Sequence, residues 1–375
     1  MKSILFIMPS LTGGGAERVL INLLRKIDYE KYQVDLLVIK KEGIYWDEVP
    51  QEVHIYILFN QPFLGNLLNK IHVKYNHHTL YKFLVNRLIK TRYDVGISFT
   101  DSSYTDVLFF LDRKIKKKIS WIHASYKSYS NYSKILVGKY RERVIRERCS
   151  KLDEIVFVSH DAKNEYVDVF GNYKNMKVIY NIIDFESVLQ KSVSESINYD
   201  NDITNFVAMG SLLPVKGYKE LLLAAKCLNE TDLSFKIRIL GEGPQRKELE
   251  DLICQLNLTN QVELLGFNKN PYPYIKNSDI FVMTSVSEAL PTALIEAMCL
   301  GLPVITTDCS GCREIVDNNK YGLISNRNPK EIAKNMYNMA IDKKLRDSYA
   351  VLSQERIKLF DEEIILNQFY ELIDE

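Results

Sequence analysis

The chain has 375 residues, which is too long for one ordinary hydrophobic core, so we expect two domains. Its 46% hydrophobic and 26% charged residues exclude a collagen-like or disordered protein, and the lack of any apolar run of about 18 residues argues against a membrane-spanning helix. The net charge of +1 hides an asymmetry: residues 1–180 hold roughly ten more basic than acidic residues, and the remainder roughly nine more acidic than basic ones. The two halves are therefore expected to meet different partners.

The apolar start of the chain superficially resembles a signal peptide. Pro9 and the glycines at 13–15 end it early and no small-residue cleavage site follows, so we predict a first β-strand and a cytoplasmic protein. Short runs rich in Val, Ile and Phe then alternate with helical patterns, which is typical of a parallel α/β sheet. The strands predicted for the first domain, residues 1–181, are 4–8, 34–39, 54–58, 94–99, 118–123, 154–159 and 177–180.

A glycine loop, Gly13-Gly14-Gly15-Ala16-Glu17-Arg18, follows the first predicted strand and opens a helical pattern. Such a loop lets the backbone approach an anion at a helix start, although a plain strand-to-helix turn is the alternative. It is not the GxGxxG dinucleotide fingerprint, because Arg18 stands where the third glycine would be. Lys40 and Lys41 follow the second strand in place of a ribose-binding acid, which further disfavours a nicotinamide-dependent oxidoreductase.

The segment 53–92 is basic and contains no acidic residue. Leu80, Phe83, Leu84 and Leu88 fall on one helical face within it. A basic amphipathic helix can lie in a membrane interface, whereas the alternative is a surface helix with a solvated basic face. We expect an anionic membrane surface rather than nucleic acid as the partner, because no recognised nucleic-acid-binding motif accompanies the charge. The basic residues are Lys70, Lys74, Lys82, Arg87, Lys90 and Arg92.

Trp121-Ile122-His123 closes the fifth predicted strand. A lone histidine is more often structural than functional. At the carboxyl end of a parallel strand, however, His123 would face a ligand cleft, and His160 occupies a similar but weaker position.

Residues 182–202 are polar and lack periodicity, which predicts a linker. Asp200-Asn201-Asp202 imitates a manganese-binding DxD pattern there, but it does not end an apolar strand, so we expect no metal. The alternation restarts in a second domain, residues 203–375, which together with the first predicts two doubly wound sheets and an interdomain cleft. Its predicted strands are 205–209, 236–240, 262–265, 279–284, 303–307 and 323–325.

Two glycine-containing loops follow strands of the second domain. The loop from Gly210 to Gly217 carries Lys216, which could be a mobile charge beside a phosphate or merely a solvated lysine. Gly241-Glu242-Gly243 follows the next strand and marks a turn. Both loops are expected at the carboxyl edge of the sheet, where open α/β sheets bind ligands.

Two acids, Glu288 and Glu296, flank a predicted helix start. Pro291 suits the first turn, and the helix predicted over 292–300 ends before Gly301. Glu288 would lie at the positive end of the helix dipole and Glu296 roughly 8 Å further along. Free N–H groups at a helix start bind phosphate, and acids beside it can accept hydrogen bonds from hydroxyls. The pattern therefore favours a ligand with sugars at both ends of a pyrophosphate, which is a nucleotide-sugar.

Cys309 and Cys312 have the spacing of half a zinc site. A zinc site needs a second pair of ligands, and none is evident in the sequence. We expect two ordinary thiols.

Taken together, these residues resemble the retaining glycosyltransferases of family 4, which have two Rossmann-like domains in the GT-B arrangement. The matching marks run almost from end to end of the chain. The Glu-x7-Glu element at 288–296, followed by Gly301-Leu302-Pro303-Val304, is the specific one, and the glycine loops only support it. The nearest enzymes are those that build capsule, exopolysaccharide or lipopolysaccharide chains.

The resemblance implies a role for each matching residue. Glu288 would contact the hydroxyls of the donor sugar and Glu296 the ribose. Lys216 would neutralise the pyrophosphate, backbone amides at the helix start would hold the distal phosphate, and His123 would lie beside the reacting sugar. The implied catalytic residues are thus His123, Lys216 and Glu288, and the implied donor-binding residues are Gly14, Gly15, Ser211, Lys216, Gly241, Glu242, Glu288, Ala289, Leu290, Pro291, Thr292 and Glu296.

The chain departs from the family pattern at two places. Ser211 stands where an arginine is usual, so one phosphate clamp is missing. Ala289 follows the first acid where glycine is common, which narrows the expected sugar pocket. These departures leave the identity of the donor open but not its class.

The resemblance implies transfer of a hexose or N-acetylhexosamine from a UDP-sugar, with retention and without a metal cofactor. The acceptor would be a growing, lipid-linked surface polysaccharide, and the protein would be peripheral on the inner face of the cell membrane. The last helix could pack back on the first domain. Two alternatives stay open, a UDP-sugar 2-epimerase of the same fold and a non-catalytic sugar-nucleotide-binding subunit.

Overall fold

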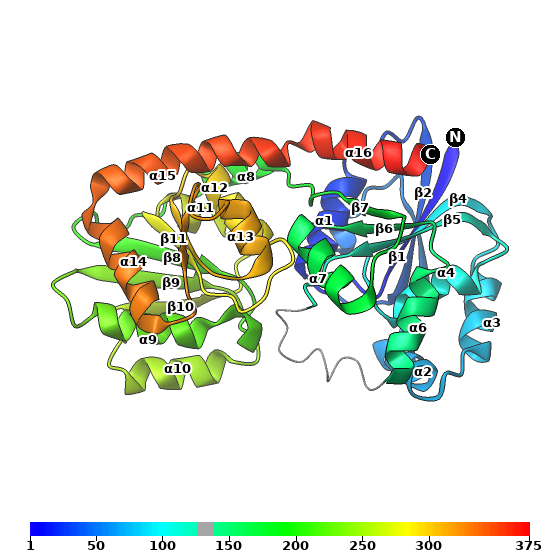
Figure 1. Cartoon of the computed structure of the whole chain (residues 1–375), viewed down its shortest axis with the longest axis horizontal. Helices are drawn as coiled ribbons and strands as arrows, with labels where there is room; N and C mark the ends of the chain where they lie inside the picture. Colours follow the sequence, from blue (N-terminus) through cyan, green and yellow to red (C-terminus); the bar gives the residue numbers. More distant parts are fainter. Residues whose placement is uncertain (127–138) are drawn as a thin grey trace. The chain divides into compact units, whose positions relative to one another are not determined.

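The chain folds into two compact α/β units (Figure 1). The computed structural model describes residues 1–126 and 139–375. The first unit contains residues 1–126, 139–182 and 362–375, and the second contains residues 183–361. No helix in the described part of the chain is both long and apolar enough to cross a bilayer.

The first unit is built on a seven-stranded parallel sheet with the order β3-β2-β1-β4-β5-β6-β7. All seven strands predicted for this domain are present, with boundaries shifted by up to three residues. β6 ends before Ser159, because the Ser159 hydroxyl accepts a hydrogen bond from Ala162 N at 3.0 Å and begins a helix. The strands are β1 (Lys2–Met8), β2 (Tyr32–Lys40), β3 (His54–Phe59), β4 (Tyr93–Ser98), β5 (Ile115–Ile122), β6 (Glu154–Phe157) and β7 (Met176–Val178).

Helices cover both faces of this sheet (Figure 1), so an inner strand such as β1 is buried on both sides. Leu5 and Ile7 of β1 belong to one core together with Tyr81 and Phe110, whereas Phe6 contacts the C-terminal helix on the other face. This is why β1 is an unbroken apolar run rather than an alternating one. The helices are α1 (Gly15–Leu24), α2 (Pro62–Tyr75), α3 (Thr79–Leu88), α4 (Asp106–Phe110), α6 (Lys139–Cys149) and α7 (His160–Phe170), with short 3₁₀ turns η1 (Trp46–Glu48) and η2 (Ser103–Thr105).

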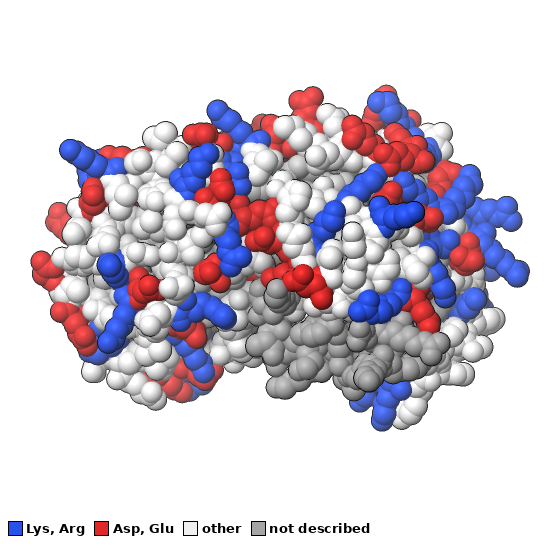
Figure 2. Space-filling model, in the orientation of Figure 1, with Lys and Arg blue, Asp and Glu red and all other residues white. Residues whose placement is uncertain are grey.

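The C-terminal helix, α16 (Glu362–Asp374), belongs to the first unit although it ends the chain. Phe369 is fully buried and stacks on Phe6 with ring centroids 6.2 Å apart. Acidic side chains gather along this helix (Figure 2), and Glu362 forms an ion pair of 2.7 Å with Lys26. The returning helix therefore neutralises part of the positive charge of the first unit.

The segment expected to be a linker, residues 182–202, contains the helix α8 (Phe185–Ser192). The Asp184 side chain accepts a hydrogen bond from Ser187 N and caps this helix, and Val188 is buried. α8 contacts the helices α11 (Tyr272–Lys276) and α12 (Thr292–Cys299) of the second unit. Polar composition therefore conceals a short packed helix in the first half of this segment.

The second unit is built on a six-stranded parallel sheet with the order β10-β9-β8-β11-β12-β13. All six predicted strands are present. The strands are β8 (Thr204–Met209), β9 (Phe235–Leu240), β10 (Val262–Gly266), β11 (Ile280–Met283), β12 (Val304–Thr307) and β13 (Leu323–Ser325). The remaining helices are α9 (Tyr218–Leu228), α10 (Arg246–Gln255), α13 (Ser310–Val316), α14 (Pro329–Ile341) and α15 (Lys343–Arg356), with 3₁₀ turns η3 (Pro214–Lys216) and η4 (Ile357–Phe360).

Each sheet has one point at which the strand order reverses. In the first unit this point lies between β1 and β4, and in the second between β8 and β11. The loops that leave the carboxyl ends of two such strands diverge, which opens a crevice where doubly wound sheets bind ligands. Any ligand site of the second unit is therefore expected between the loops that follow β8 and β11.

Candidate functional site

The loops that follow β8, β11 and β12 meet at the carboxyl edge of the second sheet. Val286 N donates a hydrogen bond to Val215 O at 2.7 Å, and Gly311 N donates to Glu288 O at 3.0 Å. The loop after β9 joins them, because Leu212 N donates to Glu242 O at 2.8 Å. The structure thus brings the residues predicted for donor binding in this domain to one edge of one sheet.

Gly217 fixes the loop that carries Lys216. Its φ of +65° lies in the left-handed region, and a Cβ at this position would lie 2.0 Å from Thr284 O. Only glycine allows this close approach. The Thr284 hydroxyl also donates to Lys216 O at 3.2 Å, so the loops after β8 and β11 are fastened on both sides of Lys216.

Lys216 and Glu288 form an ion pair at this edge. Lys216 Nζ lies 2.6 Å from Glu288 Oε1, and their side chains are 23% and 12% exposed. The Ser285 hydroxyl donates to the same carboxylate oxygen at 2.7 Å. Burial by itself lowers the pKa of Lys216, but the Glu288 carboxylate outweighs this effect and raises it, so the ammonium stays charged. An ammonium has three N–H donors, so the pair leaves Lys216 able to bind a phosphate as well.

The helix α12 begins beside this pair. Pro291 is its N-cap with φ −74° and ψ 105°, and the first intrahelical bond runs from Leu294 N to Pro291 O at 3.2 Å. The predicted helix 292–300 is confirmed to within one residue. Thr292 is half-buried at the helix start, and the N–H groups of a first turn have no partner inside their own helix. An anion placed here would also meet the positive end of the helix dipole.

The other predicted residues of the segment 288–296 are more enclosed. Ala289 and Leu290 are 8% and 6% exposed, and Glu296, on the helix itself, is 8% exposed. The start of α13 packs closely against residues 288 and 289. The Ser310 hydroxyl donates to Glu288 O at 3.1 Å, and a Cβ on Gly311 would lie 2.4 Å from Ala289 O. Ser285 and Ser310 were not predicted as site residues from the sequence, because serines near acidic residues are too common to indicate a functional site.

Ser211 and Glu242 lie at the same edge but are exposed. Glu242 is ion-paired with Arg246 on the first turn of α10. Gly241 has φ +147°, and a Cβ there would lie 1.9 Å from Gly210 O, so the two glycine loops pack backbone against backbone. Cys309 and Cys312 are buried free thiols at the start of α13, and burial raises the pKa of Cys312.

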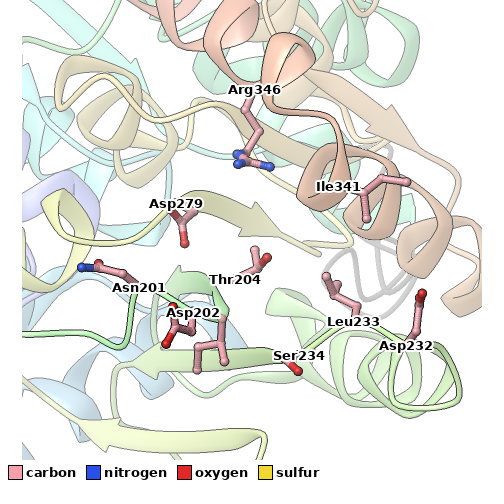
Figure 3. Close-up of a pocket in the computed structure, with 10 residues that line it drawn as sticks. Asn201, Asp202, Thr204, Asp232, Leu233, Ser234, Asp279, Ile341 and Arg346 are labelled. Carbon is pink, nitrogen blue, oxygen red and sulfur yellow. The ribbon is translucent and has the colours of Figure 1, made fainter.

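A polar hollow of about 370 Å³ lies at the opposite, amino-terminal edge of the second sheet (Figure 3). Thr204 begins β8, and Asp279 directly precedes β11, so the hollow is separated from the predicted donor residues by the length of the strands. Asp202 of the Asp-Asn-Asp pattern lies here, not at a carboxyl edge. The residues around it are Asn201, Asp202, Ile203, Thr204, Asp232, Leu233, Ser234, Asp279, Ile341 and Arg346.

In the first unit, Gly14, Gly15 and His123 lie at the carboxyl edge of their own sheet. Gly15 begins α1 and Gly14 is its N-cap, without a side-chain cap. His123 follows β5 and contacts Phe99, with ring centroids 4.7 Å apart. Burial lowers the pKa of His123 to about 3, so the imidazole is neutral at physiological pH. Its Nε2 is buried and has no hydrogen-bond partner within the described ranges 1–126 and 139–375.

A buried ionic network that includes Tyr126, three residues after His123, was not predicted. Arg148 Nε donates to Asp106 Oδ1 at 2.8 Å, and Arg148 Nη1 lies 3.7 Å from Asp101 Oδ1. The Tyr126 hydroxyl donates to Asp101, and His72 Nε2 lies 2.9 Å from Asp106 Oδ2. The network fastens Tyr126, and with it the segment that contains His123, to the loop after β4. The position of Asp101 just past the predicted strand 94–99 was the available signal.

Two family models match the chain, one over each half. "Glycosyltransferase Family 4" matches residues 13–187, and "Glycosyl transferases group 1" matches residues 191–355. An uncharacterised glycosyltransferase of Methanocaldococcus jannaschii is 29% identical over 362 residues, which is 85% of this chain and 87% of that protein. The N-acetylgalactosamine-N,N'-diacetylbacillosaminyl-diphospho-undecaprenol 4-alpha-N-acetylgalactosaminyltransferase of Campylobacter jejuni is 27% identical over 381 residues and 96% of both chains.

Solved structures share the fold. The Anabaena protein HepE, crystallised in complex with UDP, aligns with a TM-score of 0.74 at 19% identity, over 100% of both chains. At this identity the similarity concerns the fold, and that fold is the GT-B arrangement of two Rossmann-like domains.

Proposed function

The chain belongs to the GT-B glycosyltransferases of family 4, and on this basis we propose that it transfers a hexose or N-acetylhexosamine from a UDP-sugar with retention of anomeric configuration. The observation that carries the proposal is the Lys216–Glu288 pair at the start of α12, at the reversal point of the second sheet. A nucleotide-sugar needs positive charge for its diphosphate and hydrogen-bond acceptors for its hydroxyls. The Lys216 ammonium and the Glu288 carboxylate supply these two kinds of group, and they are hydrogen-bonded to each other.

Each group at this edge has a separate task in donor binding. The ammonium of Lys216 and the N–H groups at the start of α12 stabilise the diphosphate. The second oxygen of Glu288, whose first oxygen is held by Lys216 and Ser285, accepts hydrogen bonds from the donor sugar. Glu296 contacts the ribose. To make this contact, the buried side chain of Glu296 must reach the surface of the helix. Ser211 contributes no charge, so the diphosphate depends on Lys216 more than it would with an arginine there.

The reaction breaks the bond between the anomeric carbon and the diphosphate oxygen and forms a bond from that carbon to the acceptor hydroxyl oxygen. Negative charge develops on the leaving UDP, where Lys216 and the helix dipole stabilise it. The proton of the acceptor hydroxyl passes to the departing phosphate oxygen. With a pKa of about 3, His123 is too weak a base to take that proton, so its task is to position the sugar through a hydrogen bond.

The proposed acceptor is a growing, lipid-linked surface polysaccharide. The Campylobacter relative is named for an acceptor on diphospho-undecaprenol, which supports this class. The basic first domain and its acid-free segment 53–92 support a position on the inner face of an anionic membrane. No metal is assigned a task in this scheme, because Lys216 and the helix start supply the positive charge.

A panel of nucleotide-sugars, assayed for UDP release with and without a membrane lipid extract, tests the proposal. We expect release from a UDP-sugar that increases with the extract and is lost in Lys216→Ala. Conversion of the sugar at C2 without transfer of the sugar to an acceptor would instead identify an epimerase. Binding of the nucleotide-sugar with no turnover under any condition would identify a non-catalytic subunit, and either result would overturn the proposal.

A further inference from the structure

The helix α15 contacts the far ends of two short helices that begin at the predicted donor site. α12 begins beside the Lys216–Glu288 pair, and α13 begins at Ser310, which donates to Glu288 O. The last residues of these two helices are Cys299 and Val316. α15 runs beside α12 (Figure 1), and its side chains donate hydrogen bonds to the carboxyl ends of both helices.

Gln354 of α15 closes the carboxyl end of α12. Its side-chain amide donates from Nε2 to Met298 O at 2.9 Å and to Cys299 O at 2.7 Å. The last carbonyls of a helix have no partner within the helical ladder, so an amide that donates to two of them fixes the position of the helix end. The neighbouring Ser353 is fully buried and donates to Leu302 O at 2.9 Å, which fixes the turn between α12 and β12.

Arg356 of α15 closes the carboxyl end of α13. Its Nε donates to Ile315 O at 2.8 Å, and its Nη2 donates to Glu314 O at 2.6 Å. A guanidinium presents two donors in one fixed plane, and its positive charge meets the negative end of the helix dipole. The Arg356 guanidinium also lies over the Tyr321 ring, 4.9 Å from the ring centroid. These contacts hold the end of α13 against α15.

The two short helices connect these contacts to the donor site. α12 has eight residues and α13 has seven, so each spans only about 10–12 Å at 1.5 Å per residue. Isolated helices of this length are unstable in water, so their placement depends on the groups around them. At the start of α13, Gly311 N donates to Glu288 O at 3.0 Å. Gln354 therefore sets the placement of the first turn of α12, and Arg356 sets the placement of the Glu288 backbone.

From this arrangement we infer that Gln354 and Arg356 are positioning residues of the donor site, which rests on the proposed function and deepens it. Gln354 positions the groups for the diphosphate, because the start of α12 is proposed to bind it. Arg356 positions the acceptor of the sugar hydroxyls, because Glu288 is proposed to bind the donor sugar. Each acts through a helix and not by contact with the donor. A displacement of about 1 Å at a site of this kind lowers a rate by about 100-fold.

Calorimetric titration of the full-length protein with two ligands tests the inference. One ligand is UDP, and the other is whichever of UDP-glucose, UDP-galactose, UDP-N-acetylglucosamine and UDP-N-acetylgalactosamine the wild type binds most tightly. Gln354→Ala should weaken the binding of both ligands by a similar factor of about ten, because both carry the diphosphate. Arg356→Met should weaken the binding of the UDP-sugar at least about fivefold more than that of UDP, because only the UDP-sugar carries the hydroxyls that Glu288 accepts.

Arg346→Met is the matched control. Arg346 also belongs to α15 and donates to two carbonyls at the end of a helix, Met339 O and Ala340 O of α14. α14 carries no predicted donor residue, so this variant should bind both ligands as the wild type does. Arg356→Lys keeps a cation at the end of α13 without the planar pair of donors, and its affinities should lie between those of Arg356→Met and the wild type. Circular dichroism checks that the variants are folded, and Arg356→Lys decides the test if Arg356→Met is not.

The outcomes separate the inference from the proposed function. Wild-type affinity for both ligands in a folded Gln354 or Arg356 variant would overturn the inference and leave the proposed function standing. An equal loss for both ligands that Arg346→Met shares would show a general loss of stability and would also overturn the inference. A wild type that binds the UDP-sugar but releases no UDP would overturn the proposed transfer, and the selective loss in Arg356→Met would still support the inference. No binding of either ligand by the wild type would overturn both.

Discussion

Lys216 Nζ lies 2.6 Å from Glu288 Oε1, although 72 residues separate the two in the chain. Lys216 follows β8 and Glu288 follows β11, and these strands are neighbours at the point where the order of the second sheet reverses. The pair is therefore a product of topology. Glu288 keeps Lys216 charged, and the hydrogen bond between them orients both side chains before any ligand arrives, which is the preorganisation that electrostatic stabilisation of a leaving group requires.

Removing either partner should abolish most of the transfer. We expect Lys216→Ala to lower kcat by about 100-fold or more, since it removes positive charge at the leaving diphosphate. Glu288→Gln should lower kcat/KM for the donor, because the amide holds neither Lys216 nor the sugar hydroxyls as the carboxylate does. The measurement is UDP release under saturating and limiting donor. Lys219→Ala, which breaks the surface pair with Glu248, is the control and should leave both constants near those of the wild type.

Gly217 should not tolerate a side chain. Gly217→Ala places a Cβ 2.0 Å from Thr284 O in a backbone with φ +65°, so we expect a loss of about 2 kcal/mol or more in the free energy of unfolding of the second domain. Denaturant unfolding measures this loss. Gly15→Ala is the matched control, since nothing lies within 4 Å of a Cβ at that position. Equal stability of the two variants would contradict the close approach seen here.

His123 should make stability depend on pH. Its pKa is about 3 in the folded protein, whereas an unfolded histidine titrates near pH 6.5. Between these values the unfolded chain binds a proton that the folded protein does not. The contribution of the neutral imidazole to the free energy of unfolding is therefore complete above about pH 6.5. This contribution decreases as the pH falls, by about 2 kcal/mol between pH 6.5 and pH 5.

The comparison that isolates this effect is the free energy of unfolding of the wild type and of His123→Gln at a series of pH values. The slope between pH 5 and pH 7 should be shallower in the variant. The pKa of Asp94 is lowered to about 2, chiefly by its hydrogen bond with Lys116, so that group titrates below this window. The same slope in both proteins would show that His123 is not held neutral.

The C-terminal helix should be necessary for the first unit. Phe369 is fully buried against Phe6 and Trp121, so Phe369→Ala should cost about 3–5 kcal/mol of the free energy of unfolding and change the fluorescence of Trp121. Ile364→Ala, on the same helix but at a side chain that is 53% exposed, should change the stability by less than about 0.5 kcal/mol. A similar loss in both variants would mean that helix propensity, rather than this packing, holds α16 in place.

Much of the secondary structure could be read from the chain because buried parallel strands are short apolar runs. β1, β8 and β11 are examples, and glycines mark the loops that follow β1 and β8. The apolar-run pattern failed to predict strand boundaries where the local composition was misleading. β5 begins at Ile115, three residues before the predicted strand 118–123, because Lys116 and Lys117 look like part of a solvated basic run. In the structure these lysines belong to the strand, and Lys117 Nζ donates to Leu372 O of α16 at 2.8 Å.

The buried network of Asp101, Asp106 and Arg148 could not be predicted from the position of Asp101 after a strand alone. Nothing in the sequence around Arg148, which lies in a strongly basic helix, distinguishes it from its solvated neighbours. It is the packing of α6 near the loop after β4 that removes it from water and surrounds it with two carboxylates. A charged residue is predicted to be exposed unless its ion-pair partner is known. The partners of Arg148, Asp101 and Asp106, are distant from it in the chain.

The sequence by itself determined the strands, the glycine turns and the acids around a helix start, and with them the chemical class of the ligand. These features are local, because strand burial, turn geometry and capping depend on a few neighbouring residues. The tertiary structure alone decided that Lys216 meets Glu288 and that the half-buried His123 lies against Phe99, and it shows that the last helix does return to the first sheet. Those contacts depend on the order of strands in each sheet, which crossover connections set and no local pattern records.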